Sequence, residues 1–311
     1  MISMSKTSHI PDVRKNAVDI LNESVLSLEG IGIESLIERF VLHATTNLGP
    51  LDGYKTFPKP CHEIVEHVST RFGVTGVRFF LKGTISASIV NLIDSGRLKS
   101  LPQRVFEQQL AHIKRMIDNK DMQETWLDIN NDLFHKEFGL ASLRLYAAGA
   151  QVVDFRRGVP RSAILKEGIL RSSKNLLFMM KSGGFKPYFE IHTHKFHLEA
   201  FNERGWEECY RCCADLYDLH PNCLGMSGSS WFYDPHLELI SPRLSYLTKT
   251  PLNGGAKIMF FEEGGQAIDN ALSTSMTRRK LYEEGKYLPK SYMLVWRKRD
   301  QVAWANTRRH A

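Results

Sequence analysis

Four side chains that can bind metals lie within eight residues of one another, directly after an apolar stretch with strand character. These are His192, His194, His197 and Glu199, and residues 188–191 precede them. Residues two apart in a strand point to the same side, so His192 and His194 present two imidazoles to one point. Two neutral imidazoles and a carboxylate form a complete ligand set for a catalytic zinc or a non-haem iron.

We therefore predict a metal-dependent enzyme, an oxygenase or a hydrolase. Its divalent metal is iron(II) or zinc, with His192, His194 and Glu199 as ligands. His197 falls out of phase with the other two histidines unless the strand ends early. It is predicted to be catalytic or to replace Glu199 as third ligand, and His236 is a second catalytic candidate. Two other interpretations stay open. The histidines can act as acid or base without metal, since an imidazole titrates near neutrality, or they can lie on a solvated strand face.

The spacing of His192, His194, Glu199 and Gly205 resembles the first metal motif of cupins. This resemblance implies His192, His194 and Glu199 as metal ligands. A cupin continues as a β-barrel, however, whereas the apolar residues of 206–219 have helical spacing. The sequence is therefore assigned to no family.

The basic surplus of the chain is local. The net charge is +7, and the residues from Leu272 onward hold ten Lys or Arg against three acids. Such a surface attracts anions, and we predict a small anionic substrate or an acidic carrier protein as partner. Arg243 is predicted to hold the substrate, and Arg278 and Arg279 a phosphorylated cofactor. No nucleic-acid reading module is evident, so nucleic acid is not predicted as a partner.

The order of a strand at 257–261, a helix at 267–284 and a closing strand from 292 resembles the last part of GCN5-related N-acetyltransferases. The loop that would hold the pyrophosphate of coenzyme A is missing from the pattern. The basic surplus, however, would suit coenzyme A or an acyl carrier protein. The alternative function is therefore an acyltransferase that uses coenzyme A or a carrier-bound acyl group, with one of the same histidines as general base. A third hypothesis is a non-enzymatic module whose basic C-terminal segment binds an acidic partner.

Two patterns divide the chain near residue 140 and predict an α+β fold. Residues 1–140 read as a helical region; for example, a helix after Pro102 would place Val105, Phe106 and Ile113 on one side. Residues 141–311 read as a mixed α/β domain that carries the site. There we predict strands in 143–155 around Gly149, a helix from Trp206, a strand at 237–240, and a strand or hairpin at 292–304.

The cysteine count and the hydropathy predict a cytoplasmic protein. Five cysteines in a chain whose first residues lack the apolar stretch of a secretory signal favour reduced thiols over disulfides. The sequence contains no run of about 18 apolar residues, so we predict no membrane span. We therefore expect no membrane partner.

Overall fold

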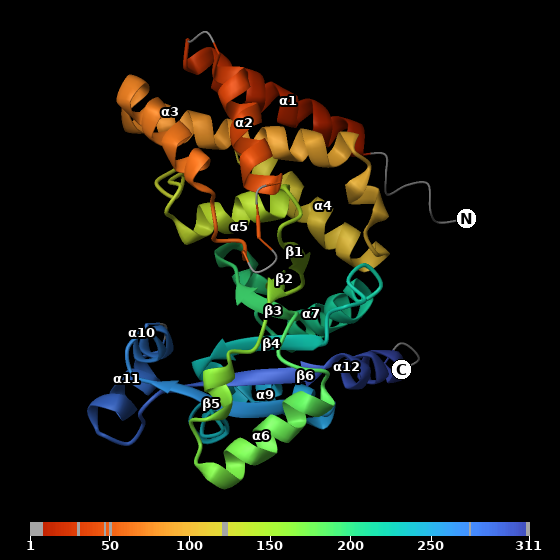
Figure 1. The fold of residues 1–311 in the computed structure, drawn as a ribbon. Coiled ribbons are helices and arrows are strands. Elements are labelled where there is room, and N and C mark those ends of the chain that lie inside the picture. Colours follow the sequence, from red (N-terminus) through yellow and green to blue (C-terminus); the bar gives the residue numbers. More distant parts are fainter. Residues whose placement is uncertain are drawn as a thin grey trace. The chain divides into compact units, whose positions relative to one another are not determined.

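The computed structural model describes residues 9–29, 32–46, 48–49, 52–119, 124–273 and 275–308. Helices dominate the N-terminal half and a mixed sheet lies in the C-terminal half (Figure 1), so the α+β prediction is confirmed. The chain forms two compact units. The first unit comprises residues 1–148, 152–154 and 193–198, and the second comprises 149–151, 155–192 and 199–311.

The first unit is a set of helices around one long central helix. Its elements are α1 (Ile10–Ser27), α2 (Ile33–Thr46), α3 (Lys59–Asp94), η1 (Arg97–Ser100), α4 (Gln103–Asp118), α5 (Asp132–Ala141) and β1 (Tyr146–Ala148). Helices α1 and α2 both pack on α3 (Figure 1). The helix predicted after Pro102 is confirmed as α4, which buries Val105, Phe106 and Ile113.

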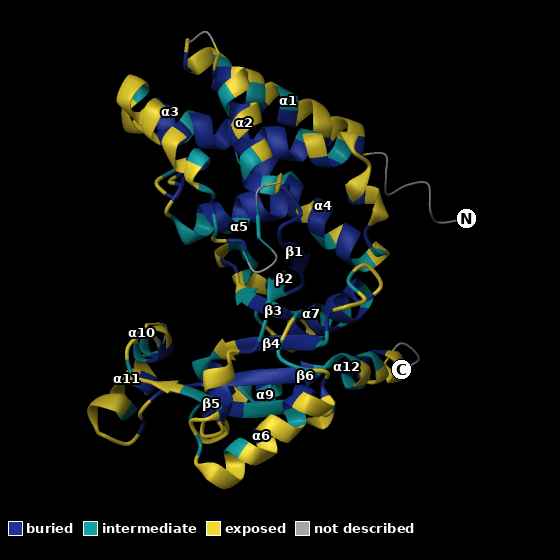
Figure 2. Ribbon diagram, in the orientation of Figure 1, coloured by how far each residue is buried: buried dark blue, intermediate teal, exposed yellow. Residues whose placement is uncertain are grey.

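Helix α3 is long and apolar enough to cross a membrane by length and composition. However, 67% of its most apolar window is buried against the rest of the protein, as Figure 2 shows along the helix. Burial of this kind is typical of the core helix of a soluble protein. Gly73, at φ 67°, breaks the helical path within α3 at a backbone angle that glycine adopts without strain.

A cluster of five phenylalanines fixes α5 against α2 and α3. The rings of Phe40, Phe57, Phe80, Phe134 and Phe138 contact one another with centroids 5.4 to 6.0 Å apart. Edge-to-face and offset contacts of this kind add to the free energy gained by burying the rings. Because Phe134 and Phe138 belong to α5, this cluster also fixes the direction in which the other side chains of α5 point.

The second unit is built on a mixed sheet with several helices. The remaining strands are β2 (Gln151–Arg157), β3 (Tyr188–Thr193), β4 (Gly225–Ser230), β5 (Lys257–Glu263) and β6 (Lys290–Arg297), and the order across the sheet is β1-β2-β3-β4-β6-β5. Strand β3 pairs with β4 in parallel, whereas β6 pairs with both β4 and β5 in antiparallel. The predicted strands around Gly149 are confirmed as β1 and β2.

The helices and 3₁₀ turns of this unit are η2 (Arg161–Ile164), α6 (Ile169–Lys181), η3 (Lys195–Ala200, partly in the first unit), α7 (Glu203–Leu216), η4 (Trp231–Tyr233), α8 (Leu237–Ile240), η5 (Pro242–Leu244), α9 (Tyr246–Asn253), α10 (Gln266–Leu272), α11 (Met276–Glu283) and α12 (Lys298–Thr307). The helix predicted from Trp206 is confirmed as α7. It buries Trp206 and Tyr210, and Tyr210 contacts Trp296 of β6. All five cysteines lie in the described part of the chain, and they are buried and form no disulfide.

Three element predictions were wrong. The helix predicted at 267–284 is divided into α10 and α11, because the side chain of Ser275 accepts the backbone N–H of Arg278 and begins a new helix. Residues 237–240 form the short helix α8 and not a strand, because the carboxylate of Asp234 accepts the backbone N–H of His236 and turns the chain before it. Residues 298–304 belong to α12 and not to a hairpin. The side chains of Gln301 and Trp304 are both buried, and a spacing of three places both on one side of a helix.

Candidate metal centre

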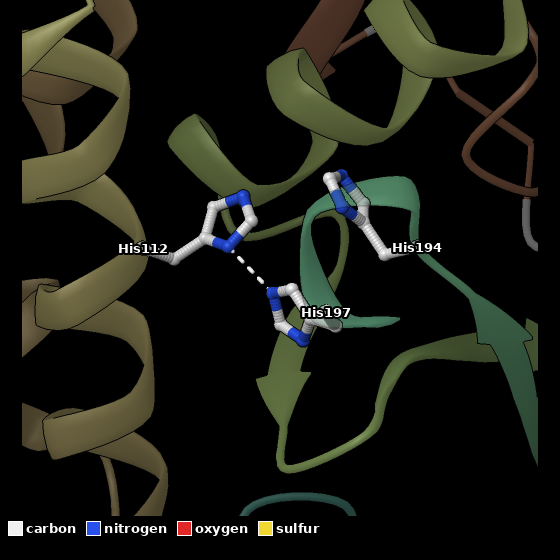
Figure 3. A group of neighbouring side chains, drawn as sticks. All are labelled: His112, His194 and His197. Carbon is white, nitrogen blue, oxygen red and sulfur yellow. Dashed lines mark hydrogen bonds between the residues drawn. The ribbon is translucent and has the colours of Figure 1, made fainter. Parts of the chain in front are cut away.

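Three histidines from two distant segments of the sequence lie close together in the first unit (Figure 3). His112 comes from the buried side of α4, and His194 and His197 come from the turn that follows β3. This turn is closed by the backbone N–H of His197, which donates to the carbonyl of His194 over 2.9 Å. A ligand atom from each ring lies within 4.8 Å of the others. We call these residues the three-histidine group.

A carboxylate lies behind two of the rings. Glu137 of α5 is fully buried, and its Oε1 lies 3.0 Å from His194 Nε2 and 3.4 Å from His112 Nε2. The guanidinium of Arg115 donates from Nη2 to both oxygens, over 2.6 and 2.5 Å. Burial acts to raise the pKa of Glu137, but the two imidazoles and Arg115 outweigh it and hold this pKa well below its usual range. Glu137 is therefore an anion at neutral pH.

The contacts of His112 fix the position of its proton. Arg115 Nη2 lies 2.8 Å from His112 Nε2, and because a guanidinium only donates, Nε2 accepts. The burial of His112 lowers its pKa, despite the nearby carboxylate, so the ring is neutral and carries its proton on Nδ1. That proton is shared with His197 Nε2 over 2.7 Å (Figure 3). The network thus assigns the tautomers of both rings.

His194 is the most buried of the three histidines, with none of its side chain exposed. Its Nδ1 accepts the backbone N–H of Phe196 over 3.2 Å. Its Nε2 lies near Glu137 but is not aligned for a hydrogen bond with any described residue. A buried imidazole nitrogen without an aligned partner costs free energy.

The arrangement suits an ion at the point where the rings meet. In many metal sites a histidine binds the ion through one nitrogen and donates the N–H of its other nitrogen to a carboxylate, which sets the tautomer. Glu137 is placed to accept such protons, because it lies near Nε2 of both His112 and His194. His112 would have to change tautomer to donate one, since its Nε2 accepts from Arg115 and its proton is on Nδ1 when no ion is bound. An ion would then replace the proton that His112 Nδ1 shares with His197.

The structure distributes the predicted site residues between the two units. His194 and His197 lie in the three-histidine group, whereas His192 and Glu199 belong to the second unit. The side chain of His192 lies 3.8 Å from Glu190. Glu199 is exposed.

The three remaining arginines and His236 also belong to the second unit. Arg278 is buried, donates to the carbonyl of Ala271 and to Ser241, and lies over the ring of Trp231. Arg243 and Arg279 are exposed. The imidazole Nδ1 of His236 lies 3.1 Å from the buried carboxylate of Asp234.

Sequence reasoning missed His112, Arg115 and Glu137. A sequence signal for Glu137 was present. Glu137 follows Phe134 by three residues and precedes Phe138, so in a helix its carboxylate lies on the same side as these buried apolar side chains. A buried charge needs a cation or several donors as partners. Arg115 and His112 lie three residues apart in α4, but nothing in the sequence says that α4 and α5 meet.

No protein-family model matches the chain, and no curated protein or solved structure is similar enough to count as a match.

Proposed function

We propose that the chain is a metal-dependent enzyme whose metal, zinc in preference to iron(II), is held by His112, His194 and His197. The observation that carries the proposal is the convergence of three imidazoles in front of a buried carboxylate. Non-haem iron oxygenases commonly use two histidines and one carboxylate as ligands. Here the carboxylate of Glu137 is already engaged by Arg115. Three imidazoles with an open fourth position are the ligand set of a catalytic zinc.

A zinc ion, when bound, lowers the pKa of a coordinated water to near neutrality and so supplies hydroxide for hydrolysis or hydration. The chain would contribute orientation and charge. Glu137 would keep His112 and His194 in the ligating tautomer, and Arg115 would keep Glu137 anionic. His197, which is partly exposed, is the member of the group that solvent reaches. The reaction class is therefore hydrolytic or hydrating.

The substrate in this proposal is a small anion. Lys195 lies between His194 and His197 in the sequence, is exposed, and carries its ammonium near the ring of Phe196 at 5.9 Å from the centroid. A cation beside the group can orient a carboxylate or phosphate. The sequence-based hypothesis assigns the anion to Arg243, which belongs to the second unit, and that assignment stays a prediction. We propose a cytoplasmic location for the enzyme, in keeping with five buried cysteines that form no disulfide.

A second candidate function uses the same residues without a metal. The 2.7 Å contact between His112 and His197, backed by Arg115, forms a chain along which a proton can move, and His197 would act as general base. This is the chemistry of the acyltransferase alternative, with coenzyme A or an acyl carrier as donor. The third hypothesis, a module that binds an acidic partner through its basic C-terminal segment, stays a prediction.

Elemental analysis of the protein purified without a polyhistidine tag tests the proposal. We expect about one zinc per chain. His197→Ala and His194→Gln should lose most of that metal and remain folded by circular dichroism. His192→Ala is the matched control, because it removes a partly buried imidazole two residues from His194 that lies outside the group.

Two results would overturn the metal assignment. If the folded protein holds no zinc or iron after anaerobic addition of either ion, the histidines act without metal and the general-base candidate replaces the proposal. If His192→Ala loses the metal and His197→Ala keeps it, the ligands are those predicted from the strand pattern.

A further inference from the structure

The second unit contains a cavity of about 670 Å³. Its walls come from α6, the segment 235–238, α9, and strands β5 and β6. Cavities of roughly 300 to 1,000 Å³ are the size at which small organic molecules are bound. None of its lining residues belongs to the three-histidine group. We call it the cationic pocket, because four of its lining residues are lysines or arginines.

Two cations of the pocket already have acidic partners. Glu167 lies 3.4 Å from the guanidinium of Arg171 and also accepts the amide of Asn175 over 3.0 Å. Glu238 lies 2.5 Å from the ammonium of Lys249. The pocket is therefore lined by four cations and only two carboxylates, and both carboxylates already contact a cation.

Two lysines of the pocket have no such partner. Within the described part of the chain, neither Lys174 nor Lys257 forms an ion pair, and the ammonium of Lys257 lies 5.6 Å from the ring centroid of Phe178. Burial lowers the pKa of Lys257; the charge of Glu167 opposes this effect, and the charge of Lys174 lowers the pKa by a smaller amount. Two like charges that face one cavity repel each other, and an anion between them would turn that repulsion into attraction.

Apolar and aromatic surface lines the same cavity. Leu252 and Ile258 contribute aliphatic side chains, and Tyr292 contributes a ring that packs edge-on against Phe260 at 5.7 Å. Tyr292 also brings a hydroxyl, which can donate to an acceptor on a ligand. A bare inorganic ion would leave most of this surface unused. The lining therefore suits a molecule with an anionic end and an organic body.

His236 adds an oriented imidazole to the lining. The buried carboxylate of Asp234 accepts from the backbone N–H of His236 over 3.0 Å and lies 3.1 Å from its ring Nδ1. The Nδ1 therefore carries a proton, and the ring is held in one orientation. Nε2, the nitrogen that does not contact Asp234, is left to interact with a ligand.

We propose that the cationic pocket binds a phosphorylated small molecule, with the phosphate between Lys174 and Lys257 and the organic part against Leu252, Ile258 and Tyr292. A phosphate near neutral pH carries up to two negative charges, which matches the two lysines that lack acidic partners. Its oxygens also accept several hydrogen bonds at once from ammonium and hydroxyl donors. This ligand site is separate from the proposed metal centre and does not depend on it.

Calorimetric titration of the full chain in the presence of a chelator tests this site with the three-histidine group free of metal. The probes are inorganic pyrophosphate, adenosine 5′-diphosphate, adenosine and citrate. We expect both phosphate probes to bind, the nucleotide more tightly, and adenosine not to bind. Lys174→Gln/Lys257→Gln should weaken both about tenfold or more, since a hydrogen bond to a charged group is worth about 1.4 kcal/mol or more.

The matched control is Lys181→Gln/Lys280→Gln, which removes the same charge from the same unit at positions that do not line the pocket. It should change the dissociation constants less than twofold. Equal weakening by the two double variants would show a general charge effect and overturn the site. Failure of the wild-type chain to bind either phosphate probe would overturn it as well. Citrate binding as tight as that of the nucleotide would overturn the assignment to phosphate.

Discussion

The three-histidine group and the cationic pocket differ in how their charged side chains are placed. In the three-histidine group the charges are buried and paired: Glu137 is fully enclosed and engaged by Arg115 and two imidazoles. In the cationic pocket the charges face a cavity, and Lys174 and Lys257 form no ion pair among the described residues. The first arrangement fixes protons at defined atoms, whereas the second leaves positive charge available to a ligand.

This difference separates residues suited to chemistry from residues suited to recognition. A buried carboxylate loses its favourable electrostatic interactions with water, so its free energy depends strongly on each of its buried partners. Lysines at an open cavity interact weakly with one another because water screens them, and they can be removed at little cost to folding. Substitutions should therefore affect stability strongly in the first region and hardly at all in the second.

The largest expected effect is that of removing the charge of Glu137. In Glu137→Gln the guanidinium of Arg115 and the two imidazoles lose their anionic partner inside the protein. Breaking a buried ion pair costs roughly 3 kcal/mol or more of unfolding free energy. Urea denaturation followed by circular dichroism measures this difference.

Glu63→Gln is the control for Glu137, since Glu63 forms an exposed pair with Lys59 on α3. It should cost less than about 1 kcal/mol. Equal losses in the two variants would mean that the carboxylate of Glu137 is not more important to folding than a surface charge, and the contrast between the two regions would fail.

The same contrast explains what the sequence could predict. The α+β fold, the position of α4 and the strands around Gly149 follow from local spacing and turn residues, and the structure confirms them. The density of histidines between 192 and 197 predicted a site that includes His194 and His197, and both lie close to a third imidazole, that of His112. Such signals can be read because each lies within a short segment.

The remaining parts of both regions depend on contacts between distant segments. His112 and His197 are 85 residues apart, and Glu137 reaches the group only because its phenylalanine neighbours fix α5. The strand alternation that linked His192 to His194 ends at Thr193, where β3 stops and the chain turns. Likewise, Lys174 and Lys257 line one cavity although they lie in different elements. No pattern within either segment predicts that they lie close together.

A smaller effect is expected at His220, a histidine of the second unit with aromatic neighbours. Its ring stacks on Phe155 with centroids 4.2 Å apart and meets Phe189 edge-on. Burial, aided by the charge of Arg156, lowers the pKa of His220 to about 4. In the unfolded chain this pKa is about 6.5. As the pH falls from about 6.5 to 4, the unfolded chain therefore binds a proton that the folded chain does not, and unfolding becomes easier.

His220→Phe keeps an aromatic ring beside Phe155 and removes this titration. The unfolding free energy of the variant should fall less than that of the wild type between pH 7 and pH 4, with the difference confined to that window. Urea denaturation at several pH values tests this. Parallel pH profiles for the two proteins would show that His220 titrates alike in the folded and unfolded chains.

The smallest effect should come from relieving the repulsion in the cationic pocket. Lys174→Gln removes one of the two like charges that face the cavity, and the pKa of Lys257, which burial and Lys174 together lower, should rise. Because both lysines are in contact with solvent, the gain in unfolding free energy is limited to a few tenths of a kcal/mol. It should be measurable at about 10 mM salt and vanish near 1 M, where screening acts over about 3 Å. A loss of stability in this variant would mean that Lys174 supports the fold, and that its charge is not held free for a ligand.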